Sequence, residues 1–122
     1  MRNVSSADHL GDGWIRSSGE IPEGGLVWLM EGDEASVLAA AGDAFKDAVD
    51  GLGGASPLGF VAFDCASRRR LLGEPRVAEE VGLMAAQAGG APLAGFYTWG
   101  EFARLRGING YHNQTLVVLA VG

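Results

Sequence analysis

The chain has 122 residues, of which 48% are apolar and 20% charged, and its formal net charge is −6. This length and balance indicate one folded domain, residues 1–122, with a single modest core. The acidity argues against a nucleic-acid-binding protein, because phosphate contacts need a basic surface. No apolar run is long enough to span a membrane, and no N-terminal export signal is present. A single cysteine, Cys65, fits a reducing cytoplasm.

The N-terminal part is expected to supply strands. The pattern predicts a short edge strand around Arg2–Val4 and a second strand over Trp14–Arg16. After a turn rich in proline and glycine, the continuous apolar run Leu26–Met30 predicts a buried strand. We expect the strands at Trp14–Arg16 and Leu26–Met30 to form a hairpin.

The middle of the chain predicts two helices around a buried strand. Asp33 is the expected N-cap of the first helix, which Gly51 ends. The apolar residues of this helix recur at helical spacing and predict a core-facing stripe: Val37, Leu38, Ala41, Phe45, Ala48, Val49 and Leu52. A strand over Pro57–Asp64 follows. A short turn over Arg68–Leu72, ended by Gly73, then leads into a second helix that begins at Glu74 and Pro75.

The C-terminal part predicts a long hairpin. Its strands are expected over Leu93–Phe102 and Gln114–Val121, with a loop between them. Gly95 and Gly100 inside the first strand indicate a bulge or the close approach of a ligand or another backbone. The whole pattern predicts an α+β fold, with a mixed, largely antiparallel sheet of about five strands and two main helices packed mostly on one face.

The end of the buried strand offers the first candidate chemistry. Asp64 and Cys65 lie there, followed by Ser67 and Arg68, and strand ends that face helix starts are where α/β proteins place ligands. A thiol beside an arginine and a helix start can be nucleophilic, but a cysteine is as readily a small buried apolar residue. A thiol enzyme would need His112 close to Cys65. No metal-ligand spacing and no phosphate-binding glycine motif occurs, so neither metal nor cofactor is expected.

Glu101 is the second candidate. Alternation along a strand would place Tyr97, Trp99 and Glu101 on one face. If Glu101 is buried, it needs a donor such as Arg68, the amino group of a ligand or a backbone amide. If it is solvated at the strand end, it carries no function.

Three stretches with their spacing resemble a known family. These are Phe63–Arg68, Gly95–Glu101 and His112–Thr115, together with an acid at Glu79 or Glu80. They are similar to the C-terminal part of the FIST domain, FIST C, a sensory domain of bacterial signal-transduction proteins that is also found in some eukaryotic F-box proteins. The resemblance implies a non-enzymatic cytoplasmic module that senses a small ligand, for which amino acids have been proposed.

The resemblance also implies partners. FIST C usually begins with residues before the stretch that matches Arg2–Val4 and usually follows an N-terminal FIST domain. We therefore expect the chain to lack the start of the domain and to work with an N-terminal FIST domain or signalling domains in a longer parent chain. An incomplete sheet exposes an edge, which predicts a homodimer or a strand-exchanged assembly in isolation.

The leading hypothesis is a ligand-binding pocket in which Arg68 holds a carboxylate and Glu101 an amino group. The predicted pocket residues are Cys65, Arg68, Tyr97, Glu101, His112 and Asn113. The alternatives are a protein-interaction module without a small ligand and a Cys65-dependent thiol enzyme. The pocket requires that the segments bearing Cys65, Glu101 and His112 converge.

Overall fold

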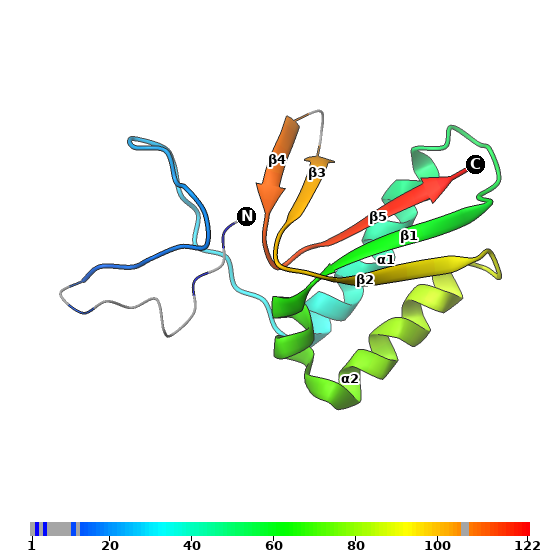
Figure 1. Cartoon of the computed structure of the whole chain (residues 1–122), viewed down its shortest axis with the longest axis horizontal. Coiled ribbons are helices and arrows are strands. Elements are labelled where there is room, and N and C mark those ends of the chain that lie inside the picture. The colour runs from blue at the N-terminus through cyan, green and yellow to red at the C-terminus, as the bar shows by residue number, and fades with distance from the viewer. Residues whose placement is uncertain (1, 3, 5–10, 12, 106–107) are drawn as a thin grey trace.

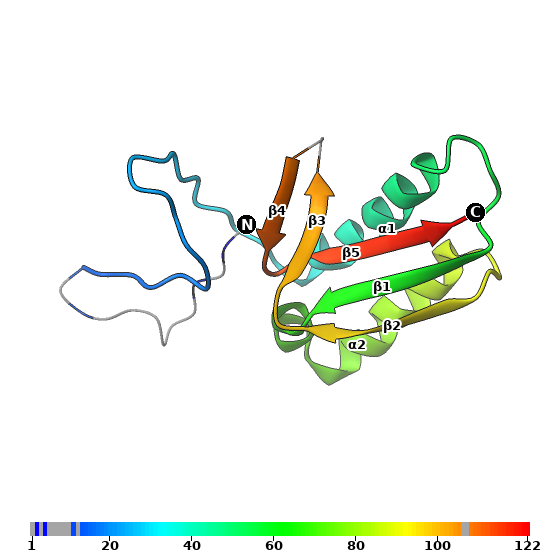
Figure 2. The ribbon, with the colours of Figure 1, turned by 45° about the horizontal axis from the view of Figure 1, so that its top comes forward.

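Two helices cover one face of a three-stranded sheet, and a two-stranded hairpin extends from one end of that sheet (Figures 1 and 2). The computed structural model describes residues 2, 4, 11, 13–105 and 108–122. Its elements, in chain order, are α1 Glu34–Asp50, β1 Gly59–Cys65, α2 Ala66–Gln87, β2 Leu93–Thr98, β3 Glu101–Leu105, β4 Ile108–His112 and β5 Leu116–Val121.

The main sheet has the order β2-β1-β5. β2 runs parallel to β1, with Phe60 opposite Leu93 and Cys65 opposite Thr98, and α2 makes the crossover that a parallel pair requires. β5 runs antiparallel to β1, with Gly59 opposite Val121. The predicted α+β class with a mixed sheet is confirmed, although the described strands divide into sheets of three and two.

Helix α1 is formed by local signals that the sequence displays. The Asp33 carboxylate accepts from the backbone N–H of Ser36 at 2.8 Å, and the Asp33 N–H donates to Ser36 Oγ at 2.9 Å, which makes a reciprocal cap. Gly51 is the C-cap. The Phe45 ring is fully buried and packs against Phe60 of β1, with centroids 5.1 Å apart. The predicted first helix is therefore confirmed. Four residues of its expected stripe are buried, namely Val37, Leu38, Ala41 and Phe45, whereas Leu52 lies beyond the end of α1.

Helix α2 is two helical segments joined at Gly73. That glycine has φ 67° and ψ 164°, a left-handed conformation that ends the first segment, and Pro75 begins the second. The predicted short turn and the helix after it correspond to these segments. In the second, Met84 and Ala88 pack into the core with Phe60.

The predicted long hairpin is wrong. A bend at Trp99 and Gly100 separates β2 from β3, and β2 and β5 flank β1 instead of pairing with each other. Gly100 has φ 151°, and a Cβ there would collide with the Tyr111 ring. β3 pairs with β4, which lies in the segment expected to be a loop, so that Glu101 faces His112. Strand patterns show where strands form but leave the choice of partner to tertiary packing.

The predicted hairpin near the N-terminus is also wrong. Between residues 13 and 33, only Ile15 makes even an isolated bridge. The run Leu26–Met30 is exposed, and Leu29 completely so. The expected edge strand at Arg2–Val4 lies partly outside the described residues, and neither Arg2 nor Val4 is in a strand. The stretch Leu26–Met30 lies beyond β4, away from the three-stranded sheet, so none of the described strands lies beside it as a partner (Figure 1).

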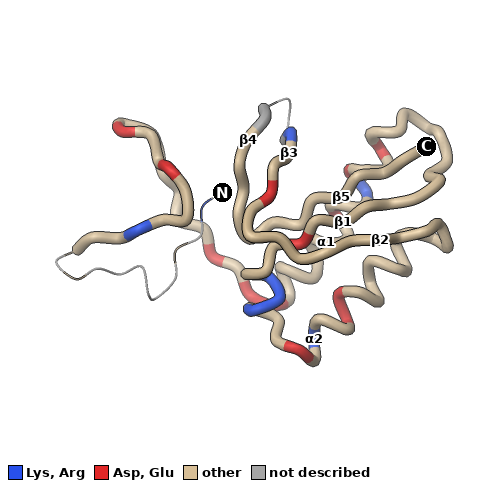
Figure 3. The backbone as a smooth tube through the Cα atoms, in the orientation of Figure 1, with Lys and Arg blue, Asp and Glu red and all other residues tan. Residues whose placement is uncertain are grey.

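Charge is spread over the elements, and the dense basic group is at the start of α2 (Figure 3). Of its arginines, Arg68 is buried, while Arg69 is exposed and forms an ion pair with Glu74 at 2.5 Å. No helix among the described residues has both the length and the hydrophobicity needed to cross a bilayer.

Candidate functional site

A buried charged cluster lies between the sheet and the two helices. Arg68 Nε donates to Asp64 Oδ1 at 2.8 Å, and Arg68 Nη2 donates to Glu80 Oε1 and to the Val37 carbonyl of α1, the latter at 3.0 Å. All three charged residues are at most 4% exposed. Arg68 therefore ties β1, both segments of α2 and α1 together.

This cluster holds more negative than positive charge. Asp64 Oδ2 and Glu80 Oε2 are buried, and outside this pair of carboxyl groups they have no hydrogen-bond partner among the described residues. Burial raises the pKa of Asp64 to about 7, Glu80 acts in the same direction through its charge and through a side-chain hydrogen bond that the two carboxyl groups share, and Arg68 opposes them. Asp64 therefore takes up a proton near neutral pH.

Of the two alternatives predicted for Glu101, a buried carboxylate with a donor and a solvated strand end, the structure shows the first. Glu101 is 2% exposed, and it accepts from Thr98 Oγ1 at 2.5 Å and from Thr115 Oγ1 at 2.9 Å. The Thr98 hydroxyl also lies 3.2 Å from the Asp64 carbonyl, an alternative acceptor for its one proton. The bend ends β2 at Thr98, so the expected face shared with Trp99, which is 90% exposed, does not form.

Three predicted segments converge where β1 ends. The Cys65 N–H donates to the Thr115 carbonyl at 3.1 Å, and Cys65 lies opposite Thr98 in the sheet. Glu101 lies at the same end of β1, because Thr98 and Thr115 both donate to its carboxylate. His112 lies opposite Glu101 in the β3–β4 ladder. A pocket of about 240 Å³ opens there, lined by Phe63, Thr98, Gly100, Glu101, Phe102 and Val117.

The residues around this junction are held by further contacts. Asn113 is buried; its Oδ1 accepts from Ser18 Oγ at 2.5 Å, and its Nδ2 donates to Tyr111 Oη at 3.0 Å. Burial lowers the pKa of His112, Arg2 acts in the same direction, and Glu101 opposes them. Cys65 is buried, and its Sγ hydrogen-bonds with Ser67 Oγ at 3.1 Å.

Arg68 and Tyr97 lie on the other side of β1. Neighbouring strand residues point to opposite faces, so Asp64 faces the helices and Cys65 faces away from them. Tyr97 lies opposite Asp64, and the Arg69 guanidinium covers its ring at 5.0 Å. Burial raises the pKa of Tyr97, and the charges of Asp64 and Glu80 raise it further.

The sequence interpretation missed several residues with clear roles. Thr98 and Thr115 hold Glu101, but the sequence marks them only as neighbours or members of the family-like stretches. The resemblance left the acid of the second helix open between Glu79 and Glu80. Asp64 was expected beside Cys65 as candidate chemistry, but its ion pair with Arg68 was not predicted. An acid that ends a buried apolar strand and an arginine shortly after it are the signal that points to the Asp64–Arg68 pair.

Comparison with known proteins identifies a family. The model of the FIST C domain matches residues 1–104 of the 122, so the stretch His112–Thr115 lies outside the matched part. No curated protein matches the chain, and no solved structure matches it. The chain belongs to the FIST C domain family, a family of sensory domains in signal transduction.

Proposed function

We propose that this domain senses a small amino compound, such as an amino acid or a similar metabolite, and binds it without chemical turnover. The observation that carries the proposal is Glu101, a buried carboxylate at the wall of a pocket, held by two neutral hydroxyls. A buried carboxylate attracts a cationic group, and an ammonium group supplies both charge and hydrogen-bond donors.

The pocket offers an apolar surface beside this carboxylate. Phe63, Phe102 and Val117 form its apolar walls, and Phe102 is 81% exposed, so the pocket opens to solvent. A small concave site with apolar walls and one oriented polar group is typical of metabolite binding. Because Arg68 Nε and Nη2 are already bonded to protein groups, the proposal rests on Glu101 and assigns the ligand no ion pair with Arg68.

The setting of this function is part of the proposal. The domain would work in the cytoplasm, where it would pass the bound state of the pocket to an N-terminal FIST domain or to signalling domains of a longer parent chain.

A thermal-shift and calorimetric screen with amino acids and related amines tests the proposal. At least one compound should raise the melting temperature in a concentration-dependent way, and Glu101→Gln should weaken its binding by about tenfold or more, because a charge-assisted hydrogen bond is lost. Asp43→Asn removes an exposed carboxylate on α1 and is the matched control. Equal binding by Glu101→Gln, shown to be folded by circular dichroism, would reject the site.

Exposed apolar groups favour a second function, association with a second copy of the chain. On the sheet face away from the helices, Phe96 is 60% exposed and Leu119 is 54% exposed, and β2 is an edge strand among the described strands. The same chain carries the exposed apolar run Leu26–Met30, which can add to such an edge as a strand.

Light scattering tests this association. The wild type should be dimeric, and Leu29→Glu should shift it to a monomer, whereas Ala39→Glu on the exposed side of α1 should leave the dimer intact. A wild-type protein that remains monomeric at high concentration contradicts the proposal.

A further inference from the structure

The run Leu26–Met30 stands directly before α1, with only three residues, Glu31–Asp33, between them. It is apolar at every position, and its side chains are exposed, that of Trp28 to 74%. A short run that is apolar on both faces is typical of a strand inside a covered sheet. We call Leu26–Met30 the N-terminal arm. It has the composition of a strand that the described sheet does not contain.

The order of elements determines the edge of the sheet at which this strand belongs. The arm, α1 and β1 have the order of a strand–helix–strand crossover, as do β1, α2 and β2. Such crossovers are right-handed in almost all proteins, so two of them with both helices on one face step across the sheet in the same direction (Figure 2). The second crossover steps from β1 to β2. The first must therefore reach β1 from the opposite side, where β5 is the edge strand.

β5 presents open backbone groups on that side. The Cys65 N–H donates to the Thr115 carbonyl, and hydrogen-bonded pairs alternate along an antiparallel ladder. Leu116, Val118 and Ala120 therefore direct their N–H and C=O groups away from β1. β5 contains neither a charged residue nor a proline, the residues that protect edge strands from pairing. This edge is suited to take up another strand.

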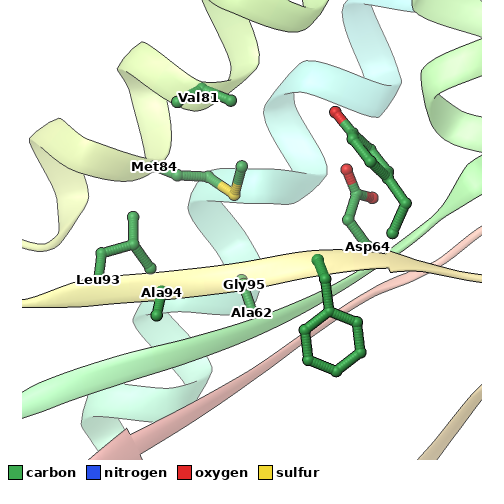
Figure 4. Close-up of a pocket in the computed structure, with 9 residues that line it drawn as sticks. Ala62, Asp64, Val81, Met84, Leu93, Ala94 and Gly95 are labelled. Carbon is green, nitrogen blue, oxygen red and sulfur yellow. The ribbon is translucent and has the colours of Figure 1, made fainter.

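The surroundings of the two edge strands differ. Leu116, Val118 and Ala120 pack against the core cluster that contains Ala41 and Phe45 of α1, so a strand beside β5 would continue a filled core. A hollow of about 230 Å³ separates β2 from α2. Figure 4 shows Val81 and Met84 on its helix side and Leu93 and Gly95 on β2. A strand beside β2 would adjoin this unfilled space, so packing also favours β5.

The course of the arm presents it to another molecule. The chain before the arm is held against β4, because Arg2 Nη1 donates to the Tyr111 carbonyl at 2.5 Å and Ser18 Oγ donates to Asn113 Oδ1 at 2.5 Å. The arm itself lies beyond β4, away from the β5 edge of its own chain (Figure 1). Exchange of an identical element between two copies makes in trans the contact that the fold defines.

We propose that the N-terminal arm of one copy adds to the β5 edge of a second copy, antiparallel to β5, and that the second copy returns the same contact. The inference rests on the association with a second copy proposed above and names its contact. Each sheet would gain one strand. The reciprocal contact closes a two-fold symmetric dimer, so the association stops at two copies.

Hydrogen exchange followed by NMR tests the contact. The amides of Leu116, Val118 and Ala120 should be protected in the wild-type dimer and should lose this protection in Leu29→Glu, a change at a completely exposed position. The amides of β2 should exchange equally in both proteins. Protection of β2 in place of β5 would leave the association intact and overturn the exchange at β5. A wild type that light scattering shows to be monomeric would overturn both.

Two matched variants on the sheet face away from the helices locate the contact. Leu119→Glu sets an unpaired carboxylate beside the added strand and should weaken dimerisation by about tenfold or more. Ala94→Glu sets the same group at an exposed position of β2 and should leave dimerisation unchanged. Circular dichroism establishes that each variant is folded, and hydrogen exchange decides if Leu119→Glu is not. Wild-type dimerisation by folded Leu119→Glu, or its loss in Ala94→Glu alone, would overturn the proposal.

Discussion

Arg68 and Glu80 form a buried ion pair across the break in α2, Arg68 in the segment before Gly73 and Glu80 in the segment after it. The pair therefore links the two segments of α2 across this break. Because Arg68 also bonds to Asp64 and to the Val37 carbonyl, the same guanidinium holds α1 and the central strand in place.

Removal of this guanidinium should destabilise the fold. Arg68→Ala leaves Asp64 and Glu80 buried without their cation, and we expect it to lower the free energy of unfolding by about 3–5 kcal/mol in urea denaturation. Arg70→Ala, at an exposed neighbouring position, should change it by less than about 0.5 kcal/mol. Similar, small losses in both variants would show that the cluster does not hold the helices together. If Arg68→Ala loses ligand binding, a measurement of its folding must show whether the domain has simply unfolded.

Asp64 should make stability depend on pH. Its pKa is raised from 3.8 to about 7 in the folded protein, so between these values the folded state binds more protons than the unfolded state. The free energy of unfolding should therefore fall as pH rises from about 4 to about 7 and then level off with respect to this group. Asp64→Asn should remove that part of the slope and should be more stable than the wild type at about pH 8.

Thermal denaturation across this pH range measures the effect. His112 acts in the opposite sense, because its lowered pKa costs stability as pH falls below 6.5, so the comparison of wild type with Asp64→Asn isolates Asp64. Asp43→Asn, at an exposed site, should keep the wild-type slope. A slope that survives in Asp64→Asn would contradict the assignment.

Two glycines should respond to alanine in opposite directions. A Cβ at Gly95 would lie 2.5 Å from the Ala62 carbonyl oxygen, so Gly95→Ala must push β2 away from β1 and should lower the free energy of unfolding by about 1–3 kcal/mol. Gly82 has open space around it on the exposed side of α2, and Gly82→Ala should raise the free energy of unfolding by about 0.5–1 kcal/mol. Urea denaturation of both variants decides, and equal effects would refute the close approach at Gly95.

Cys65 should resist alkylation in the folded protein. Its side chain is buried and hydrogen-bonded with Ser67, so iodoacetamide should react only as fast as the domain opens and should react rapidly in denaturant. A variant with Cys65→Ser and Ala39→Cys presents an exposed thiol and should react quickly in both states. Rapid, selective alkylation of native Cys65 would instead favour the thiol-enzyme alternative.

The helices could be predicted from the sequence because their signals are local. Asp33 and Gly51 bound α1 through their own hydrogen bonds and backbone angles, and Gly73 breaks α2 through its own left-handed conformation. Strand partners could not be predicted in this way. Leu26–Met30 has the composition of a strand but no neighbour to pair with, and Gly100 separates two strands that the pattern joins.

The candidate site was predictable in part for the same reason. The three stretches predicted that the segments bearing Cys65, Glu101 and His112 converge. The link between Cys65 and Glu101, however, runs through Thr98 and Thr115, which no local pattern singles out. The position of Arg68 depends on which face of the sheet the helices cover, because its guanidinium bonds to Asp64 of β1 and to the Val37 carbonyl of α1. No local pattern in the sequence determines that face.

The pairing of β1 with β5 has a consequence for synthesis. Gly59 of β1 pairs with Val121 of β5, which is synthesised much later. One edge of β1 therefore has no pairing strand while the intervening residues are translated. Contacts this distant in sequence slow folding and leave apolar strands exposed on the nascent chain. Chaperone binding on the ribosome should therefore concentrate on β1, and it should end once β5 has emerged.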